Sequence, residues 1–161
     1  MSLDVQAYLK QQVEAWETLG ARVPPIGNFV LKYGRPYAAQ PLPKNVRPMK
    51  PKECFSNAQR LVFRKTSLVY VEGYALRPGL FPIHHGWAVD SEGNVVDPTW
   101  REPETCRYFG VPFKRRYCAE RMVTLGWIGS LLDCHQDRFA LVREEIDVKT
   151  AIWVKGELAN E

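Results

Sequence analysis

Residues 67–97, with the sequence SLVYVEGYALRPGLFPIHHGWAVDSEGNVVD, decide the fold class. The stretches 67–76 and 81–89 are rich in Val, Tyr and other residues typical of strands, and a Pro-Gly turn signal separates them. Residues 91–94 form a second turn, after which residues 94–97 begin a third strand. Consecutive strands joined by such short turns favour an antiparallel sheet.

The segments before this sheet are predicted to be a helix, a loop and a second helix. Residues 2–19 carry apolar side chains at three- and four-residue steps, which is typical of an amphipathic helix. Residues 21–53 contain seven prolines, which exclude long helices and central strands. We expect an ordered, wrapping loop there, with one short strand at 29–33. Residues 54–65 have the pattern of the second helix.

The chain after the sheet is predicted to add one more strand and a mostly helical tail. Residues 108–117 are expected to form the fourth strand, interrupted by Pro112. Residues 119–145 are expected to form the tail, with breaks near Gly126 and Gly129, and residues 149–154 a short last strand. The fold class is therefore α+β, with one helix packed on an antiparallel sheet and extra helices at both ends. We expect one domain over residues 1–161, with its core at about 50–118.

Composition excludes several classes of protein. A chain of 161 residues suits one hydrophobic core, and five Trp, seven Tyr and seven Phe supply enough apolar surface to exclude general disorder. No stretch approaches the ~20 apolar residues of a membrane span, and the first residues lack the apolar centre of a signal peptide. We therefore expect a cytoplasmic protein with no membrane partner. The net charge of +4 is only mildly basic.

One of the four cysteines is a candidate nucleophile. Cys54 begins a predicted helix, and the partial positive charge of a helix N-terminus favours the thiolate, which is the nucleophilic form of cysteine. The other three have no such context and are expected to be core residues. No C-x-x-C pair occurs, so we expect no metal and no other cofactor. The remaining cysteines are Cys106, Cys118 and Cys134.

A histidine and an aspartate follow Cys54 on neighbouring predicted strands. His85 lies in the second strand, and Asp97 lies in the third strand, which the turn at 91–94 pairs with it. Cross-strand neighbours lie ~5 Å apart, so the carboxylate can reach the imidazole. A carboxylate in that place fixes the imidazole tautomer and stabilises the imidazolium. The sequence therefore predicts a Cys54–His85–Asp97 triad.

These residues occur within short motifs that resemble a known family. Cys54 at a helix start, the run His85-Gly86-Trp87 and the run Asp97-Pro98-Thr99-Trp100 resemble the papain-like superfamily, in its transglutaminase-like and related bacterial cysteine-hydrolase branches. The resemblance covers residues 50–100. It implies that Cys54 is the nucleophile, that His85 is the general base and then acid, and that Asp97 orients it. The substrate it implies is a peptide, another amide or an ester, attacked through a thioester that water or an amine resolves.

Several residues near the triad have two interpretations. His84 competes with His85, because adjacent strand residues face opposite sides of a sheet; Trp87, on the same face as His85, favours the latter. Trp87 and Trp100 either wall a substrate cleft or pack in the core. Glu72 is expected to face solvent on the tyrosine-bearing face of its strand, with substrate contact as the alternative.

A second hypothesis is a non-catalytic binding or structural protein on the same scaffold. Glu53 motivates it, because a carboxylate beside Cys54 opposes the thiolate, and so does the lack of the Gln that precedes the cysteine in the papain pattern. Basic residues at 44–65 and 114–116 are either solvated faces or a site for an anionic partner. Nucleic acid is not expected, because no nucleic-acid-binding motif and no phosphate-binding glycine loop occurs.

Overall fold

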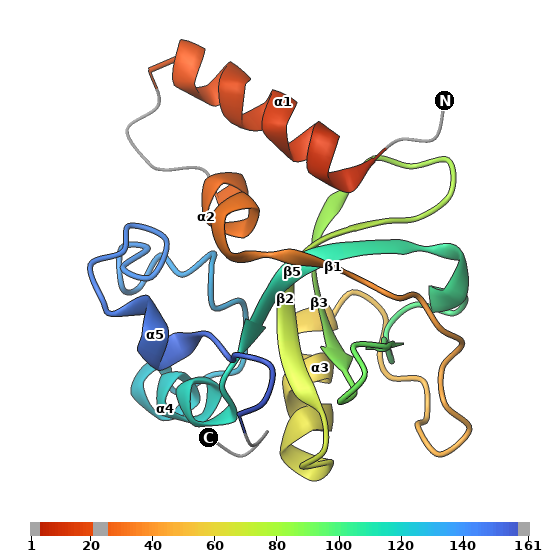
Figure 1. Cartoon of the computed structure of the whole chain (residues 1–161). Helices are drawn as coiled ribbons and strands as arrows, with labels where there is room; N and C mark the ends of the chain where they lie inside the picture. Colours follow the sequence, from red (N-terminus) through yellow and green to blue (C-terminus); the bar gives the residue numbers. More distant parts are fainter. Residues whose placement is uncertain (1–3, 21–25, 158–161) are drawn as a thin grey trace.

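A five-stranded antiparallel sheet with helices around it forms the framework of the protein (Figure 1). The computed structural model describes residues 4–20 and 26–157, and it confirms the α+β class and the antiparallel sheet. The elements are, in chain order, α1 (Val5–Thr18), α2 (Ile26–Tyr33), β1 (Arg35–Tyr37), α3 (Cys54–Arg64), β2 (Val69–Leu76), β3 (Ile83–Val89), β4 (Val95–Val96), the 3-10 turn η1 (Pro103–Thr105), β5 (Arg107–Phe113), α4 (Arg115–Leu125) and α5 (Val148–Ala151).

The sheet curls until its two edge strands meet at one end. Its strand order is β1-β5-β2-β3-β4, which makes β1 and β4 the edges. A bridge joins Ala38, just after β1, to Asn94, just before β4, and the Val95 N–H donates to the Ala38 carbonyl at 2.8 Å. The rings of Tyr37 in β1 and Trp87 in β3 lie 6.0 Å apart, although two strands separate them in the sheet order. These side chains therefore meet across the inside of the curl.

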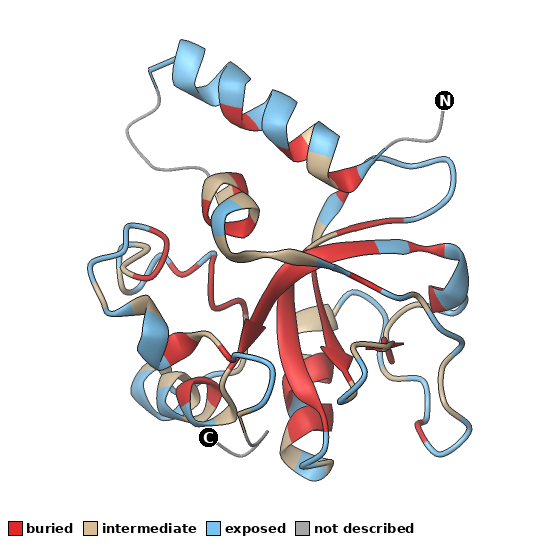
Figure 2. Ribbon diagram, viewed as in Figure 1, coloured by how far each residue is buried: buried red, intermediate tan, exposed pale blue. Residues whose placement is uncertain are grey.

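Alternating side chains along the strands divide between two apolar clusters. Those on the inner face of the curl, including Val71 and Trp87, form one cluster with Trp153 from the C-terminal segment. Those on the outer face, including Tyr70 and Ala88, pack against α1, α2, α3 and α4. Figure 2 shows the consequence, because the central strands are buried along most of their length. Both faces of the sheet are covered.

The helices before the sheet agree with the sequence pattern except at one point. α1 confirms the helix predicted over 2–19, and Asp4 caps it by accepting a hydrogen bond from the Gln6 N–H. The strand expected at 29–33 is wrong, because these residues belong to α2. The rings of Phe29 and Tyr33, one helical turn apart, lie 4.8 Å from each other, and α2 packs between α1 and β5.

The proline-rich segment is a loop over most of its described length. Residues 38–53 contain neither helix nor named strand, as expected, whereas residues 21–25 lie outside the described part of the chain. Pro36 lies in β1, where the missing N–H is tolerated because β1 is an edge strand. α3 confirms the helix predicted over 54–65, although it ends at Arg64.

The C-terminal third differs most from expectation. The fourth strand ends at Phe113 rather than at residue 117. α4 ends at Leu125, and its C-cap Gly126, with a φ of +72°, confirms the break expected there. Residues 127–145, expected to be mostly helical, form turns instead. The strand expected at 149–154 is wrong, because α5 occupies its first residues and only Ile152 makes a bridge to the sheet.

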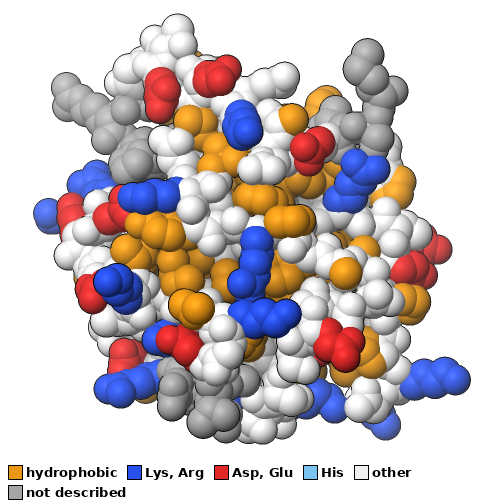
Figure 3. All heavy atoms as spheres, in the orientation of Figure 1, with side chains coloured by type: hydrophobic (Ala, Val, Ile, Leu, Met, Phe, Trp, Pro, Cys, Tyr) orange, Lys and Arg blue, Asp and Glu red, His pale blue; other side chains and the backbone are white. Residues whose placement is uncertain are grey.

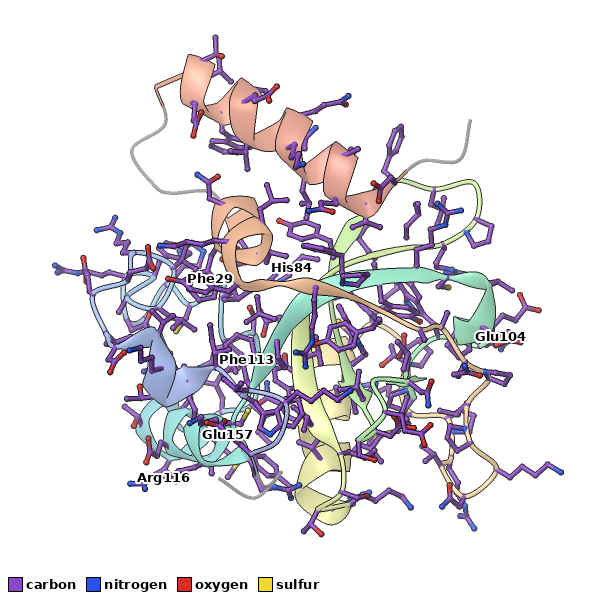
Figure 4. All side chains as sticks on the ribbon, in the orientation of Figure 1. Phe29, His84, Glu104, Phe113, Arg116 and Glu157 are labelled. Carbon is purple, nitrogen blue, oxygen red and sulfur yellow. The ribbon has the colours of Figure 1, made fainter. Side chains whose placement is uncertain are left out.

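The surface mixes apolar and charged side chains. Figure 3 shows apolar side chains gathered across the middle of one face, with Lys and Arg side chains among them. In Figure 4, Phe29 from α2 and Phe113 from β5 lie in the interior, where both are buried in the outer-face cluster. Within residues 4–20 and 26–157, no helix has both the length and the apolar character needed to cross a membrane.

Candidate active site

The candidate nucleophile lies at the N-terminus of α3. Cys54 is the first residue of this helix and is half-buried, whereas the other three cysteines are buried; all four are free thiols. Lys52, two residues earlier, has a φ of +66°, a conformation that residues other than glycine rarely adopt and that is found disproportionately at functional sites. The chain thus turns sharply into α3 and presents Cys54 at the positive end of the helix dipole.

Glu53, the residue before Cys54, forms an ion pair. Its carboxylate lies 2.5 Å from the Lys50 ammonium, and that hydrogen bond lowers the pKa of Glu53. The charge beside Cys54 is therefore locally balanced by a cation.

Gly86 allows the first turn of α3 to lie against β3. A Cβ atom added at Gly86 would lie 2.9 Å from Phe55 Cδ1 and 3.1 Å from Phe55 Cα. Only a residue without a side chain therefore permits this approach. β4 pairs with β3 only at Ala88 and Val89, so the pairing ends before it reaches His85. This combination brings Cys54 next to His85.

Asp97 is buried and accepts four hydrogen bonds. Its Oδ1 accepts from the backbone N–H groups of Thr99 at 2.8 Å and Trp100 at 3.4 Å, the turn geometry expected of an Asp followed by Pro. Its Oδ2 accepts from His85 Nε2 at 2.8 Å and from the Tyr108 hydroxyl at 3.0 Å. The carboxylate is fixed in one orientation, directed at the imidazole.

The His85 ring lies between the carboxylate and the thiol. Because Asp97 takes Nε2, Nδ1 is the ring nitrogen left for Cys54, whose thiol contributes to the environment of the ring. Burial alone would lower the pKa of His85, but the hydrogen bonds with Asp97 and Cys54 outweigh burial and raise it to about 9. The imidazolium is thus the favoured form at neutral pH, and it lies beside a sulfur atom.

Three aromatic side chains enclose this histidine. Trp100 stacks on His85 with 4.1 Å between ring centroids, and Trp87 is stacked at 6.2 Å on the sheet side. Tyr108 packs against both tryptophans. Trp87 is completely buried, whereas Trp100 is half-buried and has an exposed part that a ligand can contact. The exclusion of water strengthens the electrostatic interactions of the His85–Asp97 pair.

A second set of hydrogen bonds joins the segments that carry Cys54 and Asp97. The Asn57 amide, completely buried in α3, donates to the Lys50 carbonyl at 2.7 Å and to the Thr99 hydroxyl at 3.1 Å. The Met49 N–H donates to the Pro98 carbonyl at 2.7 Å. The end of the proline-rich loop, the start of α3 and the loop after β4 are therefore held as one unit.

Glu72 is buried, so the expectation of solvent exposure is wrong. Its carboxylate accepts hydrogen bonds from the Tyr70 hydroxyl at 2.7 Å, the Ser130 hydroxyl at 2.5 Å and two backbone N–H groups, those of Leu131 and Leu132. Burial alone would raise the pKa of Glu72, but interactions with His84, Ser130 and Leu131 lower it. The protein itself engages both carboxylate oxygens.

His84 faces away from the triad, as strand alternation requires. Its Nε2 lies 2.9 Å from Glu72 Oε1, an ion-pair distance but off the direction of a hydrogen bond. The ring packs between Phe55 and Tyr74, with centroid distances of 4.9 and 5.6 Å. Of the two adjacent histidines, only His85 therefore contacts Asp97.

Sequence reasoning did not identify Tyr108 and Asn57 as parts of the site. Tyr108 lies on the inner face of β5, and an expected strand at 108–117 gave no reason to direct its hydroxyl at Asp97. Asn57 is one helical turn after Cys54 in a predicted helix, and a buried amide in such a position is a signal that could have been followed. Both residues hold the acid and its loop in place.

Comparison with known proteins gave no match: no family model, no curated protein and no solved structure matches this chain. Metal binding has no evident site, because no group of three or more His, Cys, Asp or Glu side chains in the described part of the chain is arranged to hold an ion. The chemistry of the site is therefore argued from its geometry.

Proposed function

We propose that the protein is a cysteine-dependent hydrolase or acyltransferase that acts on an amide or ester bond through a thioester intermediate. The observation that carries the proposal is the His85 ring, which binds the Asp97 carboxylate through Nε2 at 2.8 Å and whose pKa is raised by Asp97 and by the nearby Cys54. A nucleophile, a base and a group that orients the base are the elements required for covalent acyl transfer.

Acylation begins when the Cys54 sulfur attacks the carbonyl carbon of the substrate. The C–S bond forms, and the carbonyl oxygen becomes an oxyanion, for which the Cys54 backbone N–H at the helix N-terminus is a donor. His85, whose pKa is raised to about 9 by Asp97 and Cys54 against the effect of burial, takes the thiol proton as the sulfur attacks. His85 gives that proton to the leaving amine or alcohol as the C–N or C–O bond breaks.

Deacylation reverses these roles. Neutral His85 takes a proton from water or from an acceptor amine, which attacks the thioester carbonyl. The C–S bond then breaks, and the thiolate and the imidazolium form again. Asp97 keeps its hydrogen bond to Nε2, which fixes the orientation of the ring and leaves Nδ1 for the reacting groups. Water as acceptor gives hydrolysis, and an amine gives transfer.

We further propose that the scaffold is papain-like, in the sense of the transglutaminase-like branch. The order of Cys54 at a helix start, His85 in a strand and Asp97 after the next strand supports this proposal, as does the contact of α3 with β3. A free nucleophilic thiol together with three unbridged cysteines suits the reducing conditions of the cytoplasm.

The test is acylation of Cys54 by an activated ester. Incubation with p-nitrophenyl acetate should release p-nitrophenol and leave an acetyl group on Cys54, detected by mass spectrometry of the intact protein and of its peptides. His85→Gln should lose this acylation, because no base remains next to the sulfur. Acylation of Cys54 at an undiminished rate in His85→Gln would contradict the proposal and favour a non-catalytic binding protein.

Two variants serve as matched controls. His84→Gln removes the adjacent ring from the opposite face of β3 and should keep acylation, since His84 contacts Glu72 and not Asp97. His135→Gln removes the third histidine, whose side chain is 80 % exposed, and should behave as the unmodified protein. Thermal unfolding of each variant separates loss of the base from loss of the fold.

A further inference from the structure

A hollow lies beside the triad, on the exposed side of Trp100. It has a volume of about 590 Å³, and it is formed by the loop after β2 and the segment that follows Asp97. Its lining residues are Arg77, Pro78, Leu80, Trp100, Arg101, Glu102, Thr105 and Cys106. The chemistry described above uses none of these residues except Trp100, which covers His85.

Trp100 connects the hollow to the catalytic histidine. Its ring centroid lies 4.1 Å from that of His85, and the Arg77 guanidinium carbon lies 5.7 Å from the Trp100 ring. These two steps set an upper limit of about 10 Å on the distance between the His85 ring and the Arg77 guanidinium. A substrate of a few residues whose reacting carbonyl lies beside His85 is long enough to enter the hollow, since ~10 Å is about three residues of extended chain.

The hollow has an excess of positive charge. Arg77 and Arg101 contribute two guanidinium groups, against the single carboxylate of Glu102. Neither guanidinium makes an ion pair with any carboxylate of the described residues. The planar fork of donors on arginine matches a carboxylate bidentately, and this pairing is stronger than one between neutral groups.

Most of the remaining lining residues are apolar. Pro78 and Leu80 from the loop after β2 line the hollow together with Trp100. Leu80 is 55 % exposed, and its neighbours Phe81 and Ile83 are also exposed. An apolar stem could therefore lie against these side chains, while a charged end reaches the arginines.

We propose that this hollow is the subsite that selects the substrate, and that it binds a carboxylate on an apolar stem about three residues from the bond that Cys54 attacks. The inference rests on the proposed function, because it assigns a substrate class to the same site. Arg77 and Arg101 are then specificity residues, and Trp100 forms the wall between subsite and base.

The experiment compares two thiol-reactive probes that differ only in one charge. N-bromoacetyl-6-aminohexanoate and its terminal carboxamide react alike: the Cys54 sulfur forms a C–S bond to the methylene carbon, and bromide leaves with the electron pair of the C–Br bond. In the extended probe the carboxylate lies ~10 Å from the reactive carbon. The rate of Cys54 labelling is followed by peptide mass spectrometry, and the rate with the carboxylate probe is divided by the rate with the carboxamide probe. This ratio is then divided by the corresponding ratio for glutathione, which corrects for the intrinsic reactivity of the two probes.

The expected ratio for the unmodified protein is about fivefold in favour of the carboxylate at low salt, the size of a partly exposed ion pair, and it should fall in high salt. In the double variant with Arg77→Gln and Arg101→Gln, the ratio should fall to one, because the carboxylate probe loses its advantage over the carboxamide. Glu102→Gln should raise the ratio. Arg116→Gln, a change at an exposed arginine on α4 (Figure 4), should leave the ratio as it is.

The two proposals fail in different ways. A ratio of one in the unmodified protein, or a ratio that the double variant does not change, would overturn the subsite while leaving the triad intact. Equal loss of the preference in Arg116→Gln would also overturn it, because the effect would then be one of net charge. If labelling by both probes is as fast in His85→Gln as in the unmodified protein, or if Cys54 is not labelled, the proposed function fails and the subsite with it.

Discussion

Replacing Asp97 with Asn is the sharpest change that the site allows, because it conserves shape and removes charge. Both carboxylate oxygens are engaged: Oδ1 by the backbone N–H groups of Thr99 and Trp100, and Oδ2 by His85 and Tyr108. An amide has only one oxygen. If that oxygen serves the two backbone donors, the amide NH2 faces His85 Nε2.

The consequence for His85 is a change of tautomer. With an N–H donor opposite it, Nε2 must accept, so the proton moves to Nδ1, which faces the sulfur. His85 can then no longer take a proton from Cys54. The pKa of His85, raised to about 9 by Asp97 and Cys54 against burial, should fall to its ordinary 6.5 or below. That interval corresponds to about 3 kcal/mol of stabilisation of the imidazolium.

The expected functional loss follows from the loss of the base. Asp97→Asn should slow acylation of Cys54 by ~10²- to 10⁴-fold, the range that general acid–base catalysis contributes. Stopped-flow release of p-nitrophenol measures the rate, and NMR titration of the three histidine rings measures the pKa of His85, with His84→Gln and His135→Gln for assignment. If the His85 ring of Asp97→Asn still titrates near pH 9, or if acylation keeps its rate, the role assigned to Asp97 is refuted.

Three further predictions concern the supports of the site. Glu72→Gln should lower the free energy of unfolding in urea by ~2–4 kcal/mol. The buried carboxylate accepts hydrogen bonds from Tyr70, Ser130 and two backbone N–H groups, and an amide leaves some of these donors unpaired. A loss no larger than that caused by substituting an exposed residue would show that these bonds are unimportant for stability. Gly86→Ala should destabilise the protein by ~1–3 kcal/mol and slow acylation of Cys54. The added Cβ would lie 2.9 Å from Phe55 Cδ1 and displace the start of α3. Unchanged acylation would mean that the position of Cys54 does not depend on the close packing of α3 against β3. The raised pKa of His85 predicts a contribution to stability that is fully present below pH 6.5 and is lost as the pH rises through about 9. The difference in free energy of unfolding between the unmodified protein and His85→Gln should therefore shrink with rising pH, by up to about 3 kcal/mol. A difference that grows with pH would contradict the pairing of His85 with Asp97.

Local sequence patterns predicted correctly those elements whose contacts are between residues close together in the chain. Strand alternation and the hairpin turn placed His85 and Asp97 on facing strands, and the start of the helix at Cys54 followed from its apolar spacing. The contact of Cys54 with His85 is a long-range one. It depends on Gly86, whose missing side chain lets the first turn of α3 lie close against β3.

The errors came from residues whose structure is set by distant partners. Residues 29–33 are a short apolar run, which by itself does not distinguish a strand from a helix, and packing against α1 decided for the helix. Glu72 is buried because Ser130 and its neighbours, about 60 residues later, cover it. The same bonds hold the tail in turns, where its composition indicated helix.

The central claim is that His85 activates Cys54, and alkylation of Cys54 measures this most directly. Exposure alone would make Cys54 the fastest of the four thiols, because Cys106, Cys118 and Cys134 are buried. The comparison must therefore be made at Cys54 itself, with iodoacetamide at pH 6, in the unmodified protein and in His85→Gln. We predict that the substitution slows alkylation of Cys54 at least ~10-fold, because the imidazolium beside the sulfur is gone. Equal rates in the two proteins would contradict the account.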